Sequence, residues 1–270
     1  MVAEVDDRLI LALPNGRILA EVMPLLRRAG VEPEPAFEDP ASRRLRFATS
    51  EPDLDLIRVR SFDVATFVAF GAAQLGVAGN DVLMEFDYSE IYAPLDLEIG
   101  RCHIAVAATI DWVAREDGSQ PSHIRVATKY PEITRRHFAA RGIQAECIKL
   151  NGAIELAPRL GLCRHIIDLV QTGATLKANG LVEIERIAEV SSRLIVNRPA
   201  LKTKPEEVGG WVERFRAAVA GTRFSSGAGP SSAAGRATPS PAMRETEGVH
   251  RGSDGRGAGP PLGGGVSDAG

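Results

Sequence analysis

The sequence predicts an α/β protein whose sheets are covered by helices. Short apolar runs of strand length alternate with helical patterns from residue 8 to residue 219. Most of these helical patterns stop at a glycine, the residue that most often follows a helix end. Hydrophobic residues make up 44% and charged residues 25% of the chain, as in an ordinary soluble globular protein. Because strands joined through a helix usually pair in parallel, the alternation favours parallel sheets with covering helices.

The N-terminal part of the chain carries the first of these alternations. Its expected strands, each a short apolar run, are residues 8–13, 45–49, 54–59 and a strand that starts at residue 75. Its expected helices, each followed by a glycine, are residues 18–29 and 64–70. The chain turns at Gly79, and Asp81 is the expected N-cap of the next helix.

The same alternation continues from residue 102 onward. The expected strands are residues 102–109, 124–128, 144–149, 166–170, 181–190 and 193–196. The expected helices are residues 132–141, 155–160, 176–179 and 206–219. From residue 221 the composition changes to Gly, Ser, Ala and Pro with few large apolar side chains. Because such a segment buries too little surface to offset its ordering entropy, we expect residues 221–270 to be a disordered tail.

Composition and motifs exclude several classes of function. The net charge of -3 gives no general attraction to nucleic acid, and no apolar run has membrane-spanning length. The acidic N-terminus lacks the features of a secretory signal. Cys102, Cys147 and Cys163 fit neither a disulfide framework nor a zinc site, so we expect reduced thiols and a cytoplasmic protein. The five histidines do not cluster in the sequence, and we assign them no role.

The segment after the expected strand at residues 166–170 has the chemistry of a phosphate cradle. Residues 172–175, Thr-Gly-Ala-Thr, lead into a helix start whose unpaired N–H groups attract an anion. Gly173 lets the backbone approach closely, and the two threonines add hydroxyl donors. Asp168 has the wrong charge for phosphate, but its oxygens suit ribose hydroxyls or magnesium. The residues suggest a phosphorylated sugar, although for the tetrapeptide alone a plain turn with Asp168 as a capping residue is the favoured explanation.

Other anion-binding candidates lie in the N-terminal part. Gly16 forms the tight turn before the first helix, and Arg17 lies at its mouth. Arg58 and Arg60 alternate with apolar residues on a strand, so they share one face, where an anion or a carboxylate would relieve their repulsion. Gly79 would let a flat or anionic group come close to the backbone. The simpler alternatives are a solvated helix start for Arg17 and an exposed strand face for Arg58 and Arg60.

The spacing within residues 155–181 resembles that of the ATP phosphoribosyltransferase family, which catalyses the first step of histidine biosynthesis. The residues that carry the resemblance are Glu155, Gly161, Ile166, Asp168, Leu169, Thr172, Gly173, Thr175 and Leu176, with Ala178-Asn179-Gly180-Leu181 after them. Thr128-Lys129-Tyr130-Pro131 also matches a family stretch, and the resemblance extends from about residue 9 to about residue 202. The chain departs from the family at Cys163, usually Ser, Ala or Gly, and at Asn15, near which a lysine is usual. The second departure transfers the neutralisation of phosphate to Arg17.

The resemblance implies a fold and a reaction. The fold is two α/β domains with a cleft between them, as in periplasmic binding proteins. The implied domains are residues 1–101 with 183–220, and residues 102–182, before the tail. The reaction joins N1 of ATP to C1 of 5-phosphoribosyl 1-diphosphate and releases diphosphate. Because N1 already carries a lone pair, no general base is required, and we assign no catalytic acid or base. Magnesium, held mainly by the substrate, would assist.

The resemblance also implies site residues and a partner. The residues expected to hold phosphoribosyl diphosphate are Glu155, Asp168, Thr172, Gly173, Ala174 and Thr175. Those expected to contact the nucleotide or its polyphosphate are Gly16, Arg17, Arg58, Arg60 and Gly79. The length resembles the short form of the family, so we expect a hetero-oligomer with a regulatory subunit similar to histidyl-tRNA synthetase, and neither nucleic acid nor membrane as a partner. The alternatives are a non-catalytic two-domain module that binds small anions and a phosphoribosyltransferase that uses another base.

Overall fold

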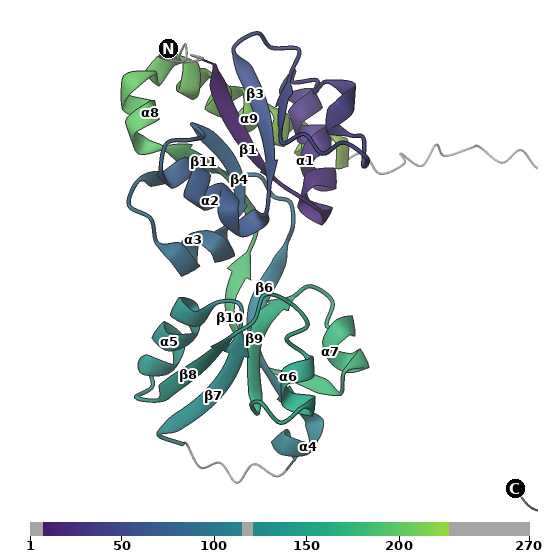
Figure 1. Cartoon of the computed structure of the whole chain (residues 1–270), viewed down its shortest axis with the longest axis vertical. Helices are drawn as coiled ribbons and strands as arrows, with labels where there is room; N and C mark the ends of the chain where they lie inside the picture. The colour runs from purple at the N-terminus through teal and green to yellow at the C-terminus, as the bar shows by residue number, and fades with distance from the viewer. Residues whose placement is uncertain (1–7, 115–120, 227–270) are drawn as a thin grey trace, which may run out of the picture. The chain divides into compact units, whose positions relative to one another are not determined.

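The computed structural model describes residues 8–114 and 121–226 (Figure 1). In these ranges the chain forms a six-stranded sheet and a five-stranded sheet, each with helices packed against it. No helix in the same ranges is both long enough and apolar enough to cross a membrane.

The six-stranded sheet has the strand order β2-β3-β1-β4-β11-β5. Its strands are β1 (Leu9–Pro14), β2 (Arg46–Ala48), β3 (Leu54–Val59), β4 (Leu75–Gly79), β5 (Ile91–Asp96) and β11 (Ser192–Asn197). The central strand β1 pairs in parallel with β3 and β4. The outer pairs β2–β3, β4–β11 and β11–β5 are antiparallel.

Helices cover both faces of this sheet. They are α1 (Arg17–Arg28), the short 3-10 helix η1 (Pro35–Phe37), α2 (Ser61–Ala69), α3 (Asn80–Phe86), α8 (Arg198–Thr203) and α9 (Pro205–Ser226). On one face Leu11 and Leu13 of β1 lie in one core with Leu26 of α1 and Phe215 of α9. On the other face α2 and α3 contribute to a second core, which includes Val64. The amino ends of α1 and α3 both follow the carboxyl ends of strands, where parallel sheets usually bind ligands.

The five-stranded sheet has the order β10-β6-β9-β7-β8. Its strands are β6 (Cys102–Thr109), β7 (His123–Thr128), β8 (Gln144–Lys149), β9 (His165–Val170) and β10 (Leu181–Val190), and its helices are α4 (Ile110–Val113), α5 (Pro131–Ala139), α6 (Leu156–Arg159) and α7 (Ala174–Ala178). One core contains Ile133 and Phe138 of α5. The other core contains Ala157 of α6 and Leu176 of α7. The loop between β9 and α7 therefore lies at the end of a buried strand.

The α/β class is confirmed, but the expectation of parallel sheets is only partly right. In the second sheet β7 pairs in parallel with β8 and β9, whereas β6 pairs antiparallel with both β9 and β10. The physical reason is the course of the chain. It runs into this sheet along β6 and out of it along β10, so these neighbours point in opposite directions.

Most predicted strands and helices are present, and the missed ones are short or lack an apolar run. The missed elements are β5, η1, α4 and α8. Strand β5 contains Pro94 and exposes 44% of Tyr92. Because it lies at the edge of its sheet, a missing backbone donor and a solvent-facing side chain are tolerated there.

Three expectations about boundaries need comment. Asp81 is not the N-cap of α3, which is Gly79; it lies in the first turn with its carboxylate buried. Helix α9 extends to Ser226, so the first residues of the expected tail are helical, and residues 227–270 lie outside the described residues. Strand β10 stays in the second sheet as far as Val190, so the expected return to the first domain at residue 183 falls inside this strand. The domain division stays a prediction.

Candidate active site

The loop that connects β9 to α7 has a backbone suited to an anion. Gly173 has φ 73°, a left-handed conformation, and directly precedes α7. A side chain is strained in this conformation, so glycine is the residue that fits it. Helix α7 has only five residues, so its dipole is small. The anion-binding capacity of this loop therefore rests on the N–H groups and threonine hydroxyls of the turn itself.

A pocket of about 250 Å³, here called the phosphoribosyl pocket, gathers the expected sugar-binding residues. It is lined by Arg17, Cys102, Glu155, Asp168, Leu169, Val170, Gln171, Thr172, Gly173, Ala174, Thr175 and Leu176. All of the residues expected to hold phosphoribosyl diphosphate are among them. Glu155 comes from the start of α6 and Asp168 from the end of β9, so the tertiary fold brings together two carboxylates that are separated in the sequence. That these residues bind the sugar stays a prediction.

The carboxyl group of Asp168 lies in an unusual environment. Its Oδ1 accepts a hydrogen bond from the backbone N–H of Leu169 at 2.8 Å. Burial raises the pKa of Asp168 to about 6, and the charge of Glu155 adds to this rise. The Leu169 N–H and the ammonium of Lys129 act in the opposite direction. Titratable groups with a shifted pKa occur often in functional sites, because burial and neighbouring charges there adjust each group's pKa to its chemical role.

Arg17, in helix α1 on the other sheet, reaches the loop between β9 and α7. It is the first residue of α1 and follows Gly16, whose φ is 89°. Its guanidinium Nη1 donates a hydrogen bond to the side-chain oxygen of Gln171, within the loop after β9. Its Nε is 3.9 Å from Glu21. Because the side chain of Arg17 is 53% exposed, it can exchange Gln171 for a substrate phosphate at little cost.

A second pocket of about 110 Å³, here called the junction pocket, adjoins the first. Its lining is Pro14, Arg17, Ile18, Ser61, Phe62, Ala78, Gly79, Asp81, Val82, Gly100, Cys102, Lys129, Tyr130, Leu169, Val190 and Ser192. Arg17, Cys102 and Leu169 line both pockets. The two pockets are therefore parts of one site, with residues from both sheets.

Position 79 requires glycine, because another side chain of the junction pocket lies where a Cβ atom would be. A Cβ atom at this position would meet Oδ1 of Asp81 at 2.0 Å. The Asp81 carboxylate is buried and accepts a hydrogen bond from the hydroxyl of Tyr130 at 2.8 Å. The side chain that approaches Gly79 is thus a buried carboxylate of the protein.

Gly79→Ala is expected to destabilise the protein by about 1–3 kcal/mol, because displacement of Asp81 leaves the buried Tyr130 hydroxyl without its acceptor. Urea unfolding measures this loss. The matched control is Gly152→Ala, because no heavy atom lies within 4 Å of a Cβ there. Equal free energies of unfolding for the two variants would contradict the close approach.

Arg58 lies in β3, whereas Arg60 lies beyond the end of this strand as the N-cap of α2, and the two have different surroundings. The guanidinium of Arg58 donates to the backbone oxygens of Phe37 at 2.9 Å and Ser42 at 3.2 Å, and it lies over the ring of Phe47. Its contacts hold the segment between α1 and β2. Arg60 is exposed and immediately precedes α2, whose first residues line the junction pocket. Neither arginine lines either pocket, and their contact with a nucleotide stays a prediction.

Sequence reasoning missed several residues of the site. Lys129 and Tyr130 line the junction pocket, and Asp81 does so as a buried carboxylate, although we expected only a helix cap. The signal for the first two was the stretch 128–131, which matched the family but suggested no chemistry by itself. Cys102 lines both pockets, and burial, the largest cause, raises the pKa of its thiol to about 11. The thiol is therefore un-ionised at neutral pH.

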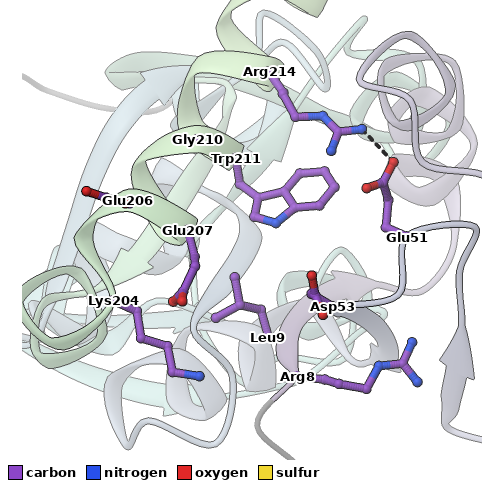
Figure 2. A pocket seen from close by; sticks show the side chains of 10 residues that line it. All are labelled: Arg8, Leu9, Glu51, Asp53, Lys204, Glu206, Glu207, Gly210, Trp211 and Arg214. Carbon is purple, nitrogen blue, oxygen red and sulfur yellow. Dashed lines mark hydrogen bonds and ion pairs between the residues drawn. The ribbon is translucent and has the colours of Figure 1, made fainter.

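A larger cavity of about 490 Å³ lies elsewhere, against the amino end of α9 (Figure 2). It is lined by Arg8, Leu9, Glu51, Asp53, Lys204, Glu206, Glu207, Gly210, Trp211 and Arg214. Arg214 donates to Glu51 at 2.8 Å and lies 4.1 Å from the centre of the Trp211 ring. Because this guanidinium already has a carboxylate and an aromatic partner, the cavity is a weaker candidate for phosphate binding than the two adjoining pockets.

Comparison with known proteins decides which family has this site. A family model described as ATP phosphoribosyltransferase matches residues 60–217. The chain belongs to the ATP phosphoribosyltransferase family. An ATP phosphoribosyltransferase from Paramagnetospirillum magneticum is 70% identical over 216 residues, which are 80% of this chain and 99% of the relative. One from Rhodospirillum rubrum is 68% identical over 212 residues, covering 78% and 93%.

A solved structure agrees with this family. The ATP phosphoribosyl transferase (HisG:HisZ) complex from Thermotoga maritima contains a chain that superposes with a TM-score of 0.67 at 30% identity, covering 79% of this chain and 99% of that one. The expected family is confirmed. The activity is that of a pentosyltransferase that condenses ATP with 5-phosphoribosyl 1-diphosphate in histidine biosynthesis. Membership of an enzyme family favours catalysis over the non-catalytic anion-binding module.

Proposed function

We propose that the phosphoribosyl pocket holds the sugar substrate of the ATP phosphoribosyltransferase reaction. The loop of Thr172, Gly173, Ala174 and Thr175 binds the 5-phosphate through backbone N–H groups and hydroxyls. Asp168 and Glu155 accept hydrogen bonds from the ribose hydroxyls. One observation carries the proposal: carboxylates from two separate elements and the turn after β9 line a single pocket together with Arg17.

The mechanism needs charge stabilisation more than proton transfer. The N1 lone pair of ATP attacks C1 of the ribose while the bond from C1 to the diphosphate oxygen breaks, so negative charge develops on the diphosphate. Arg17 lines both pockets, so its guanidinium can stabilise this negative charge as it develops. Gly16, which precedes α1, is the backbone position proposed to approach the polyphosphate, whereas the same role for Gly79 would require the Asp81 carboxylate to move away from it. Arg60 is proposed to contact the same group from the start of α2, whereas any such role for Arg58 would require it to leave its backbone partners.

Magnesium is proposed as a substrate-held cofactor. Magnesium in nucleotide sites is usually bound by one or two carboxylates together with substrate phosphates. Asp168 and Glu155 are the carboxylates of the phosphoribosyl pocket that fit this donor set. In the described residues no group of three or more His, Cys, Asp and Glu side chains is placed to hold a metal ion. Bound with the substrate, magnesium would neutralise charge on the diphosphate.

The proposed setting is a cytoplasmic hetero-oligomer. The free thiols of Cys102, Cys147 and Cys163 support a reducing compartment. The Thermotoga maritima structure is a HisG:HisZ complex, and this likeness supports a regulatory partner similar to HisZ. Full activity and inhibition by histidine in the purified chain alone would refute the dependence on a partner. In the proposed two-domain division, residues of both domains form the site. The chain returns to the first domain near Val190 rather than at residue 183, because β10 pairs with β6 as far as Val190.

The direct test mixes the chain with ATP, phosphoribosyl diphosphate and magnesium, with and without a HisZ-type subunit. Formation of the N1-substituted adenine is followed by its absorbance. Turnover that requires both substrates supports the proposal. Turnover with a base other than adenine would favour the alternative transferase, and absence of turnover in the presence of the partner would refute the proposal.

The pH dependence of kcat/KM tests the role of Asp168. Because its pKa is about 6, the carboxylate is ionised at pH 8 and protonated well below pH 6. The ionised form accepts hydrogen bonds from ribose hydroxyls, so kcat/KM for phosphoribosyl diphosphate is expected to fall as pH decreases through about 6. The substrate phosphate titrates in this range as well, and Asp168→Asn is the control for it. An unchanged profile in that variant would assign the whole pH effect to the substrate.

A further inference from the structure

The junction pocket contains a lysine for which the reaction described so far has no task. The Lys129 ammonium lies 4.2 Å from the centre of the Phe62 ring. Lys129 is only partly exposed, and among residues 8–114 and 121–226 it has no ion-pair partner. A partly desolvated cation beside an aromatic ring gains most from an anion that binds next to it. Arg17 lines the same pocket, so two cationic side chains face a space of about 110 Å³.

The carboxylates near Lys129 do not serve as its anionic partner. Asp81 is occupied by the Tyr130 hydroxyl at 2.8 Å. Burial is the largest influence on the pKa of both Asp81 and Asp168 and raises both, while the Lys129 charge opposes the rise. The ammonium is thus close enough to influence both carboxylates without forming a salt bridge to either. It lines the junction pocket.

Two carboxylates of α3 hold the residues that follow Lys129. Both oxygens of Glu85 accept from the backbone N–H of Glu132, at 3.0 and 3.1 Å, and Oε2 also accepts from Ile133 at 3.0 Å. Helix α5 has no side-chain cap of its own at Tyr130, so Glu85 supplies the missing acceptor from the other sheet. Asp81, four residues earlier on α3, holds the Tyr130 hydroxyl. Glu85 is 6% and Tyr130 0% exposed, so these contacts are shielded from water.

We propose that Lys129 is a catalytic residue that binds the diphosphate of phosphoribosyl diphosphate, and that Asp81, Tyr130 and Glu85 are the positioning residues that hold it there. The inference rests on the proposed function of the adjoining phosphoribosyl pocket. When the bond from C1 to the diphosphate oxygen breaks, its electron pair stays on that oxygen, and the ATP N1 lone pair forms the new bond to C1. No proton moves in this step. Lys129 stabilises the charge that the departing oxygen acquires.

Lys129→Gln is the first test, in the full chain with the partner subunit if turnover requires it. We expect kcat to fall roughly 30-fold, because a single fixed charge at a developing anion has been removed. Inhibition by inorganic diphosphate should weaken about 10-fold, while binding of ribose 5-phosphate should not change. The matched control is Lys149→Gln, an exposed lysine at the end of β8. Lys129→Arg should recover part of the activity.

Positioning is tested by a double-mutant cycle. Tyr130→Phe removes only the hydroxyl that Asp81 holds, and Glu85→Gln is a second variant in case the first loses stability. Each is expected to lower kcat by roughly 5- to 10-fold in the wild-type background and to have little further effect in Lys129→Gln. A purely structural contribution would lower kcat equally in both backgrounds and would refute the positioning role.

The outcomes separate the two proposals. If the wild-type chain shows neither turnover nor binding of phosphoribosyl diphosphate, the proposed function is wrong. If the wild type is active and Lys129→Gln keeps its kcat and its inhibition by diphosphate within twofold, only the inference about Lys129 is wrong.

Discussion

Asp168→Asn is expected to lower kcat/KM for phosphoribosyl diphosphate roughly 100-fold, because hydrogen bonds from ribose hydroxyls to a carboxylate are charge-assisted and asparagine offers only one neutral acceptor. The substitution keeps the shape of the side chain. The effect should be larger on the sugar substrate than on ATP, because Asp168 lines the phosphoribosyl pocket with the Thr172–Thr175 turn. Initial rates measured against each substrate in turn separate the two constants.

The same variant should not lose stability, and this distinguishes function from folding. Burial raises the pKa of Asp168 from 3.8 to about 6, so the folded state favours the protonated form. That contribution to stability is complete below pH 3.8 and is lost as the pH rises through about 6. Asparagine is neutral, so at pH 7.5 the Tm is expected to be equal to or higher than that of the wild type. A lower Tm together with unchanged kinetics would remove Asp168 from the site.

Arg17→Gln is expected to lower kcat roughly 100-fold, because Arg17 is the arginine that lines both pockets and, in the proposed mechanism, stabilises the negative charge on the diphosphate. Glutamine can replace the hydrogen bond to Gln171 but not the charge. Steady-state kinetics at saturating concentrations of both substrates measure the loss.

The control for Arg17 lies on the same helix. Arg28→Gln removes an exposed charge in the last turn of α1, away from both pockets, and should leave kcat unchanged. Because Arg17 is exposed, neither variant should lower the Tm by more than about one degree. A kcat for Arg17→Gln within threefold of that for Arg28→Gln would exclude a role in charge stabilisation.

Much of the fold and part of the site could be predicted from local sequence. Strands β3, β8 and β10 have the predicted bounds, because each is a short run between clear breaks. The turn at Gly173 is found where Thr-Gly-Ala-Thr predicts it, because a left-handed residue at a helix start favours glycine strongly. Strand β5 was missed, because an edge strand with Pro94 has no buried apolar run to reveal it.

The roles of individual charged residues were harder to predict. Alternation predicts that Arg58 and Arg60 share one face of a strand, but β3 ends at Val59 and Arg60 is the N-cap of α2. The pattern also gives no sign that Arg58 donates to the backbone of the segment before β2. Asp81 follows a glycine turn and therefore resembles a cap, yet its acceptor capacity is used by Tyr130, 49 residues away in sequence. Partners at such separation depend on how two sheets meet and leave no periodic signal.

The sequence by itself determined the α/β class, the family, and the turn of residues 172–175 with Asp168 before it, because short-range backbone preferences and residue spacing encode these features. Only the tertiary structure decided that Arg17 of α1 reaches Gln171, that the sheets are mixed, and that α3 caps α5 through Glu85. The physical reason is that such contacts depend on the burial and orientation of distant elements, which are set when the sheets and helices pack and not by any local pattern of residues.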